Sequence, residues 1–243
     1  MFTLYTKEIK AFFSSIMGYI IMGTFLVVTG LFLWVFSNYY NIFEMNMADL
    51  QGLFSISCYL FLFLIPAITM RTFSEEKKSG TMELLFTKPL SDNAIIGAKF
   101  LACVTFLLIA LLPTLLYVFT IWKLGNPIGN IDLGSTWGSY IGLFLLGIIF
   151  ISIGIFASSL TNNQIIAFIL GAVFCFFVHF GFEFIYSFGI FGGAGGFIKS
   201  LGIEHHYQAI SKGVVDSRDI IYFITTTFIF LFGTKIVLLS RKW

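Results

Sequence analysis

The sequence predicts an all-α integral membrane protein with six transmembrane helices. Hydrophobic residues make up 58% of the 243 and charged residues only 11%, whereas a soluble domain has about 25% charged residues. The mean hydropathy is +0.95. The long charge-free stretches also divide into segments of about 20 residues, the length that a helix needs to cross a bilayer. The chain is therefore expected to form a single membrane domain, residues 1–243.

The spans are located by the absence of charged residues. Three charge-free stretches give the first three spans. Residues 133–182 are also free of charge, but they are too many for one helix, and the polar cluster 161–164 divides them. The last span contains Lys235 near its end, where a long side chain can reach the interface. The predicted spans are about 16–36, 52–70, 98–121, 139–160, 165–186 and 220–240.

Two segments outside the spans have patterns of their own. Residues 2–15 place apolar side chains on a helical period and Lys7 and Lys10 on other faces, which predicts an amphipathic helix along the cytoplasmic interface. Residues 182–203 are apolar but are interrupted by glycines at a density that breaks a helix. A broken external or re-entrant segment is therefore expected between the fifth and sixth spans. The glycines are Gly189, Gly192, Gly193, Gly195 and Gly196.

The orientation of the chain is predicted from its lysines and arginines. Ten of the 14 lie on the side that carries both termini and residues 71–99, and four lie on the other side. Short cytoplasmic loops of membrane proteins are enriched in positive charge. Both termini and the loop after the second span are therefore expected in the cytoplasm, which for a bacterial protein places the chain in the inner membrane.

The cytoplasmic loop 71–92 holds most of the polar chemistry. A helix through 71–78 is expected to end at Gly80, since glycine is a common C-cap, and Thr81 can cap a short helix 82–86. Such a helix suits docking in a groove of another protein, although a solvated loop that only orients the spans would fit the spacing equally well. The side chains expected to be presented are the carboxylates of Glu75, Glu76 and Glu83 and the apolar groups of Leu84, Leu85 and Phe86.

This loop resembles the signature loop of ABC-2-type transporter permeases. The resemblance is carried by the charged lead, the Gly-Thr pair, the following glutamate, the leucine pair and the proline, in the run Glu75-Glu76-Lys77-Lys78-Ser79-Gly80-Thr81-Met82-Glu83-Leu84-Leu85 followed by Lys88-Pro89-Leu90-Ser91. Within the family the chain is most similar to the gliding-motility-associated permeases of Bacteroidetes. That likeness rests on the length, the opening Tyr5–Ser15 and the ending Ser240–Trp243.

The resemblance implies a function and a set of partners. Such a permease is the membrane subunit of an ATP-driven exporter, working with two ATP-binding subunits and a second permease chain, identical or larger and paralogous. ATP and Mg are then bound by the partner. The chain itself would be no enzyme, would hold no cofactor or metal, and would contact lipid but no nucleic acid. The resemblance assigns coupling to Glu75, Glu76, Gly80, Thr81 and Glu83, with Lys7 and Lys10 of the interfacial helix beside them.

The sequence itself supports this division of labour, because it contains no G-x-x-x-x-G-K-[ST] phosphate-binding loop. Two alternatives stay open. One is an ion-coupled secondary transporter or channel, which would be expected to carry a charge or a broken helix near mid-membrane. The other is a membrane-embedded metalloenzyme, because His179 and Glu183 share a helical face and a second cluster follows. The metal ligands would then be His179, Glu183, Glu204, His205 and His206.

Overall fold

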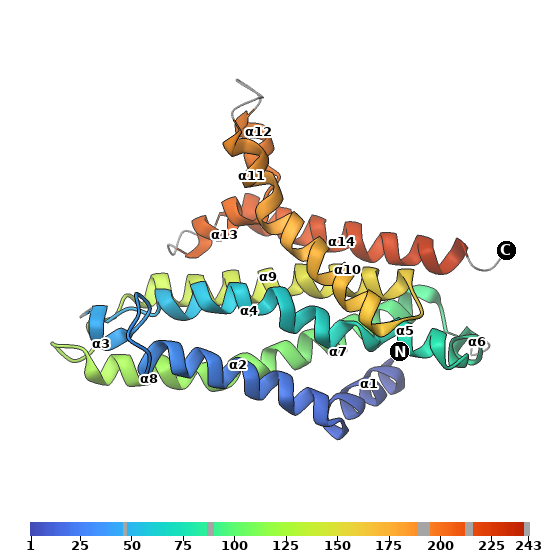
Figure 1. Cartoon of the computed structure of the whole chain (residues 1–243), viewed down its shortest axis with the longest axis horizontal. Helices are drawn as coiled ribbons and strands as arrows, with labels where there is room; N and C mark the ends of the chain where they lie inside the picture. Colours follow the sequence, from blue (N-terminus) through green and yellow to red (C-terminus); the bar gives the residue numbers. More distant parts are fainter. Residues whose placement is uncertain (46–47, 87–89, 189–194, 212–215, 241–243) are drawn as a thin grey trace.

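The computed structural model describes residues 1–45, 48–86, 90–188, 195–211 and 216–240, and within this part the secondary structure is helical, without strands. The longer helices lie roughly along the longest axis of the molecule, whereas α11 and α12 project from the bundle (Figure 1). In chain order they are α1 (Phe2–Ser14), α2 (Ile16–Trp34), α3 (Ile42–Met45), α4 (Gln51–Thr69), α5 (Arg71–Lys78), α6 (Thr81–Phe86), α7 (Asp92–Leu111), η1 (Leu112–Thr114), α8 (Leu115–Leu124), α9 (Leu133–Leu160), α10 (Gln164–Phe176), η2 (Phe177–Gly181), α11 (Phe182–Ser187), α12 (Gly195–Ser200), α13 (Ile203–Ser211) and α14 (Ser217–Leu239).

Six helical segments of the described part are long and apolar enough to cross a membrane, which confirms the predicted number. Several are longer than predicted, because polar caps and loop helices continue them. The fourth, for example, begins with Asp132, whose carboxylate accepts a hydrogen bond from Ser135 N at 3.1 Å. The six segments are Ile16–Trp34, Gln51–Lys78, Asp92–Leu124, Leu133–Leu160, Gln164–Ser187 and Ser217–Leu239.

Helix α9 is the centre of the bundle. It packs against α4, α7, α10, α13 and α14, and its apolar side chains are buried along most of its length. Glycines on α9 permit this close approach: a Cβ at Gly154 would overlap with the Thr69 hydroxyl of α4, and one at Gly147 would overlap with Leu107 of α7. The small residues of this span therefore serve packing within the chain.

The third span is broken near its middle, which the hydropathy pattern did not predict. Pro113 lies in the one-turn helix η1 between α7 and α8, and proline disrupts the hydrogen-bond ladder of a continuous helix. The turn is held from the side, because Tyr140 of α9 donates a hydrogen bond to the Thr114 carbonyl at 3.0 Å. Both parts remain in one membrane-length segment.

Helix α1 precedes the first span at an angle and packs on α7 and α2 (Figure 1). Its amphipathic pattern is reflected in its burial: Leu4 is buried, whereas Lys7 and Lys10 are exposed. Phe12 lies against Phe106 of α7, with ring centroids 5.3 Å apart. The predicted helix is therefore present, with its apolar side on the bundle.

The fifth span changes helix type before it ends. A π-helical turn, η2, interrupts it at Phe177–Gly181, and α11 continues it away from the bundle towards α12 (Figure 1). The chain then returns through α13 to α14, and His206 of α13 bonds Asp219 of α14 at 2.6 Å. This confirms a broken segment after the fifth span. Gly189, Gly192 and Gly193, which the sequence singled out here, lie outside the described residues.

Candidate functional site

Helices α5 and α6 form a bent element, here called the elbow (residues 71–86), directly after the second span. Gly80 turns the chain with φ 70°, in the left-handed region that favours glycine. Ser79 Oγ lies 2.9 Å from Thr81 Oγ1 and donates to the Glu75 carbonyl at 2.9 Å. The predicted end of the first helix is confirmed, and the second helix begins at Thr81 itself.

The predicted coupling residues divide between two sides of the elbow. Glu75, Gly80, Thr81 and Glu83 are exposed, whereas Glu76 turns into the protein. Among the side chains that the structure describes, the outer face of the elbow therefore carries the carboxylates of Glu75 and Glu83 together with the ammonium of Lys78.

The expectation that Leu85 is presented to a partner is wrong. Met82 and Leu85 belong to the hydrophobic core, with 7% and 8% of their surfaces exposed, because α6 folds back on α5. The side chains of Leu84 and Phe86 lie outside the described part. Apolar docking through Leu85 is thereby excluded.

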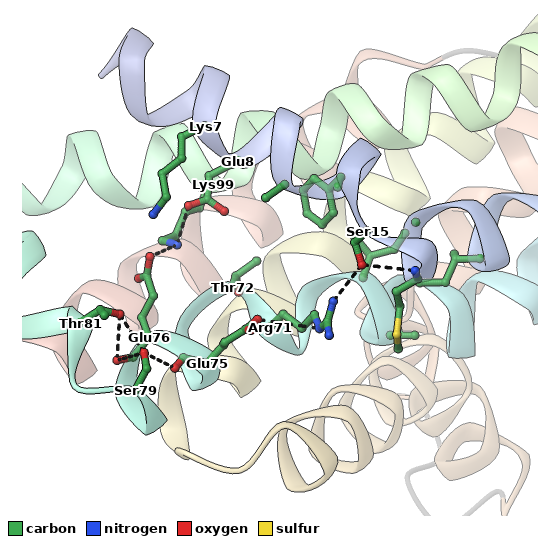
Figure 2. Close-up of a pocket in the computed structure, with 17 residues that line it drawn as sticks. Lys7, Glu8, Ser15, Arg71, Thr72, Glu75, Glu76, Ser79, Thr81 and Lys99 are labelled. Carbon is green, nitrogen blue, oxygen red and sulfur yellow. Dashed lines mark hydrogen bonds and ion pairs between the residues drawn. The ribbon is translucent and has the colours of Figure 1, made fainter.

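A buried ion cluster joins the elbow to two other helices. The ammonium of Lys99, on α7, lies 3.0 Å from Glu8 Oε1 of α1 and 2.9 Å from Glu76 Oε1 of α5 (Figure 2). Only 1% of the Lys99 side chain is exposed, and 14% of each carboxylate side chain. Phe73 lies under the ammonium, at 5.3 Å from the ring centroid.

The cluster carries one positive and two negative charges, so its formal charge is negative. Glu76 Oε2 is buried and has no hydrogen-bond partner among the described residues. Buried charges are strongly destabilising when a partner is removed, because the remaining charge is neither paired nor solvated. Lys99 therefore holds α1, α5 and α7 in one arrangement.

Arg71, the first residue of α5, makes a second link to α1. Its Nη1 donates to Ser15 Oγ at 3.2 Å, and its Nε lies 3.8 Å from Glu75 Oε2. Ser15 lies between α1 and α2, where its hydroxyl also accepts from Met17 N at 3.3 Å and so caps the first span. The elbow is thus connected to the start of the first span through a single side chain.

Ser158 of α9 fixes the base of α5 to the centre of the bundle. Its hydroxyl accepts hydrogen bonds from Phe73 N and Ser74 N, both at 3.1 Å, and donates to the Met70 carbonyl at 2.9 Å. These N–H groups belong to the first turn of α5, where helical partners are missing. Lys77 Nζ bonds the carbonyl of Ser159 in the same region.

A cavity of about 340 Å³ lies between the elbow, α1 and α7 (Figure 2). Its walls include Lys7, Glu8, Thr72 and Glu76. Lys7 thus lines the same cavity as residues of the elbow, while Lys10 is exposed on α1. Sequence reasoning missed Glu8, Lys99 and Ser158, because their partners are far away along the chain.

Comparison with protein families decides what kind of protein carries this elbow. The family model described as ABC-2 family transporter protein matches residues 3–239. The chain belongs to this family. A comparison with curated proteins found no match. Family membership makes the permease a multi-pass transmembrane subunit of an ABC transporter, itself not catalytic, and implies association with an ATP-binding subunit.

Of the five metal ligands that the sequence suggested, the described part of the permease brings together two, His179 and Glu204. Both ring nitrogens of His206 have ordinary partners, Asp219 at 2.6 Å and the Ser200 carbonyl at 2.8 Å, and His205 is exposed. His179 lies 2.8 Å from Glu204. Among the described residues, the group of ligand atoms that lie within 4.8 Å of one another at His179 does not include Glu183.

Glu204 and Tyr207 of α13 lie outside the spans and face this histidine. Burial acts to raise the pKa of the Glu204 carboxyl, but the hydrogen bond and charge of His179, together with the Gln208 amide, lower it on balance. Burial, with the nearby Cys58 and Glu204, raises the pKa of Tyr207 well above its usual value. Tyr207 therefore stays a neutral donor, and its hydroxyl bonds the Phe54 carbonyl at 3.3 Å.

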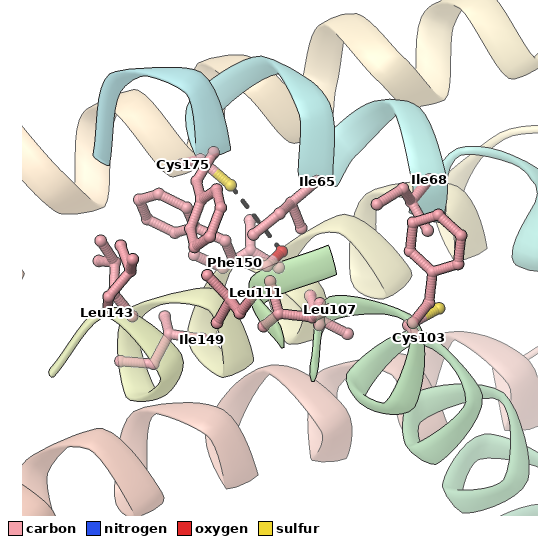
Figure 3. Packing of buried hydrophobic residues seen from close by; sticks show 14 of the residues in the cluster. Ile65, Ile68, Cys103, Leu107, Leu111, Leu143, Ile149, Phe150 and Cys175 are labelled. Atoms are coloured by element: carbon pink, nitrogen blue, oxygen red, sulfur yellow. Dashed lines mark hydrogen bonds between the residues drawn. The ribbon is translucent and has the colours of Figure 1, made fainter. Parts of the chain in front are cut away.

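The three cysteines of the permease are free thiols and all are buried. Cys103 and Cys175 lie in the apolar core, among residues such as Ile65, Leu107 and Phe150 (Figure 3). These two act as small residues of the apolar core. Cys58 differs, because its Sγ lies 3.1 Å from His179 Nε2.

Proposed function

We propose that the permease receives the movement of a separate ATP-binding subunit through the elbow and passes it to the spans, as part of an exporter in the bacterial inner membrane. Glu75, Gly80, Thr81 and Glu83 are the residues that contact the ATPase. Glu76 instead acts inside the protein, together with Lys99 and Glu8. The single observation that carries the proposal is the buried Lys99, which ties the elbow to α1 and α7.

The contacts of the elbow support transmission of a push. One end of α5 is anchored to α9 by Ser158, and its side is held to α1 and α7 by Arg71 and Lys99. A displacement of α5 must therefore move these helices or break buried hydrogen bonds and ion pairs. Breaking them leaves buried polar groups without partners, which costs about 1–3 kcal/mol each.

The chemistry of the exposed face supports an ionic contact with the ATPase. With Leu85 buried, the exposed groups among the described side chains of the elbow include the carboxylates of Glu75 and Glu83. We propose that the groove of the ATP-binding subunit presents basic side chains to Glu75 and Glu83. Lys7 and Lys10 of α1 are also exposed, and in this proposal they add positive charge beside the carboxylates of the elbow.

The outer helices support contact with lipid and with a second permease chain. Helices α10 and α14 expose large apolar side chains. Contact of these side chains with water is unfavourable, and a bilayer or another apolar helix would cover them. We propose that a second permease, identical or a larger paralogous subunit, and two ATP-binding subunits complete the transporter. The exposed residues include Ile165, Ile169, Val173, Phe176, Phe228, Ile229 and Phe232.

We further propose a place in a gliding-motility-associated complex. Support comes from the likeness of the opening Tyr5–Ser15 and the ending Ser240–Trp243 to permeases of that group. Purification of the permease from its native membrane, with mass-spectrometric identification of the retained proteins, tests this. Retention of gliding components supports the assignment, and retention of an unrelated ABC system contradicts it.

The ATPase contact is tested by reversing charge on the exposed face. The variant Glu75→Lys/Glu83→Lys should lose the ATP-binding subunit in a pull-down from detergent-solubilised membranes, because like charges would then oppose each other. The matched control is Glu44→Lys, an acidic residue of α3 at the other end of the second span. It should retain the subunit.

Undiminished retention by the double variant would rule out the proposed ionic contact. Loss of the subunit from the Glu44→Lys control as well would also contradict it, since position 44 lies away from the elbow. Size-exclusion profiles of all three proteins show whether the fold is retained.

A further inference from the structure

The strongest unexplained feature lies at the other end of the second span from the elbow. A cavity of about 590 Å³ is lined by residues from the beginnings of α4 and α9, from η2 and from α13. Cys58, His179 and Glu204 meet on its wall, one from each of α4, η2 and α13. Neither the family assignment nor the coupling proposed above accounts for this group.

The side chains of Cys58 and Glu204 both approach one ring nitrogen of His179. His179 Nε2 lies 3.1 Å from Cys58 Sγ and 2.8 Å from Glu204 Oε2, and the three possible ligand atoms all lie within 4.8 Å of one another. In a tetrahedral zinc site, bonds of about 2.0–2.3 Å place ligand atoms about 3.3–3.6 Å apart. Nε2 would therefore have to move away from the sulfur and the oxygen by several tenths of an ångström, and these two atoms, at most 4.8 Å apart, would have to take up the same spacing.

The two ring nitrogens of His179 have different surroundings. His179 is fully buried, and its Nδ1 has no partner among the residues that the structure describes. If Nδ1 carries the proton, Nε2 turns a lone pair towards the Glu204 carboxylate. A cation between Nε2 and that carboxylate would bind the lone pair and balance the negative charge, while Nδ1 would keep its proton.

The backbone at His179 is itself unusual. The residue lies within the π-helical turn η2, and such turns occur frequently at functional sites. From this turn the His179 side chain contacts Cys58 of α4 and Glu204 of α13. An edge-on contact with Phe150, at 5.8 Å between ring centroids, supports the imidazole from the α9 side.

We propose that Cys58, His179 and Glu204 form a Zn²⁺ site whose fourth coordination position opens on the cavity. One thiol, one imidazole and one carboxylate are a donor set that suits zinc, and three protein ligands with one open position are typical of sites that bind a water or another molecule. The bound ion would link α4, η2 and α13 at the end opposite the elbow. The proposal does not depend on the ATPase contact.

The test uses the full-length permease, purified in detergent on a tag without histidine and stripped with a chelator. Co²⁺ replaces Zn²⁺ as a spectroscopic probe, because it reports thiolate ligation by a charge-transfer absorption band. Titration should give stoichiometric binding with that band, displaced by Zn²⁺. In the unmodified protein Zn²⁺ should also raise the melting temperature, since the ion binds only the folded state.

Matched variants locate the site. Cys58→Ser should abolish the charge-transfer band, and Glu204→Gln should weaken Co²⁺ binding at least about a hundredfold, since even outer-shell changes cost ten- to hundredfold. Cys103→Ser, another buried thiol, and His205→Ala, an exposed histidine beside the site, should bind like the unmodified protein.

Two results would overturn the proposal. The first is an unmodified protein that binds no Co²⁺ stoichiometrically and gains no thermal stability from Zn²⁺. The second is a Cys58→Ser variant that keeps the band, which would place the ion at another thiol.

Discussion

Lys99 is the residue on which the inner arrangement depends. Replacing it by methionine keeps the length of the side chain but leaves Glu8 and Glu76 facing each other in a site where each is mostly buried. Removing one partner of a buried ion pair costs about 3–5 kcal/mol. We expect Lys99→Met to lower the melting temperature in detergent markedly, as measured by intrinsic fluorescence.

The matched control for Lys99 is Lys10→Met, because Lys10 is an exposed lysine on α1. Its melting temperature should hardly change, since exposed ion pairs contribute about 0–1 kcal/mol. Adding Glu76→Gln to Lys99→Met should recover part of the loss by removing one uncompensated charge. Equal melting temperatures for Lys99→Met and Lys10→Met would show that the cluster does not hold these helices together.

Ser158 offers a second test, on hydrogen bonding alone. In Ser158→Ala the N–H groups of Phe73 and Ser74 lose their acceptor while buried, at about 1–3 kcal/mol each. Ser152→Ala on the same helix is the control, since the Ser152 hydroxyl only donates to the carbonyl of Ile149. Amide hydrogen exchange should increase in α5 for Ser158→Ala and stay unchanged for Ser152→Ala. The opposite pattern would contradict the anchoring of α5.

The sequence predicted acidic residues in the elbow but not their different roles. Glu75 and Glu76 are neighbours in a polar run, and nothing in that run distinguishes them. Glu76 turns inward because it pairs with Lys99, 23 residues further along the chain, and because α1 lies beside it, whereas Glu75 stays exposed. Such contacts between distant segments are invisible to local patterns, which is why Glu8 and Ser158 also escaped notice.

At the scale of helices, the approach of α4 to α9 depends on Gly154. An alanine there would place its Cβ against Thr69 Oγ1, which is itself bonded to the Ile65 carbonyl at 3.0 Å and lacks room to move. Overpacking of this kind costs about 1–3 kcal/mol. Gly154→Ala should therefore lower the melting temperature, whereas Gly23→Ala, with nothing within 4 Å of its Cβ, should not. A neutral Gly154→Ala would show that the two helices can separate at this point.

The existence of the helices was more predictable than their interruptions. The lengths of the charge-free stretches and the polar cluster 161–164 were enough to predict six spans, because a helix must have a minimum apolar length to cross the bilayer. The break at Pro113 was not predicted, although proline is a visible signal. The π-helical turn that carries His179 has no comparable sequence signal, and the contact of His179 with Cys58 joins residues 121 positions apart.

At the scale of the molecule, the features with possible function lie at two ends of the same helices. The elbow and its ion cluster follow the end of α4 and contact the end of α9, whereas Cys58 and the larger cavity lie near their beginnings. Helices α4 and α9, held together by close packing, connect the two ends. Movement of the elbow can therefore reach the cavity through rigid helices rather than through loops.

The proposed orientation predicts which end faces the cytoplasm. Ser79 is an exposed residue of the elbow, and Ile128, 72% exposed, lies in the loop at the opposite end between α8 and α9. A membrane-impermeant maleimide added to intact cells should label Ile128→Cys and spare Ser79→Cys until the membrane is opened. The native cysteines are buried and provide the unlabelled background. Labelling of Ser79→Cys alone in intact cells would invert the topology.

The most direct test of the central claim is photo-cross-linking from the exposed face of the elbow. A photoreactive amino acid at Glu83 should give a covalent adduct with the ATP-binding subunit in native membranes, identified by mass spectrometry, and the same group at Ile128 should give none. An adduct from Ile128 with none from Glu83 would contradict the claim that the elbow is where the ATPase acts.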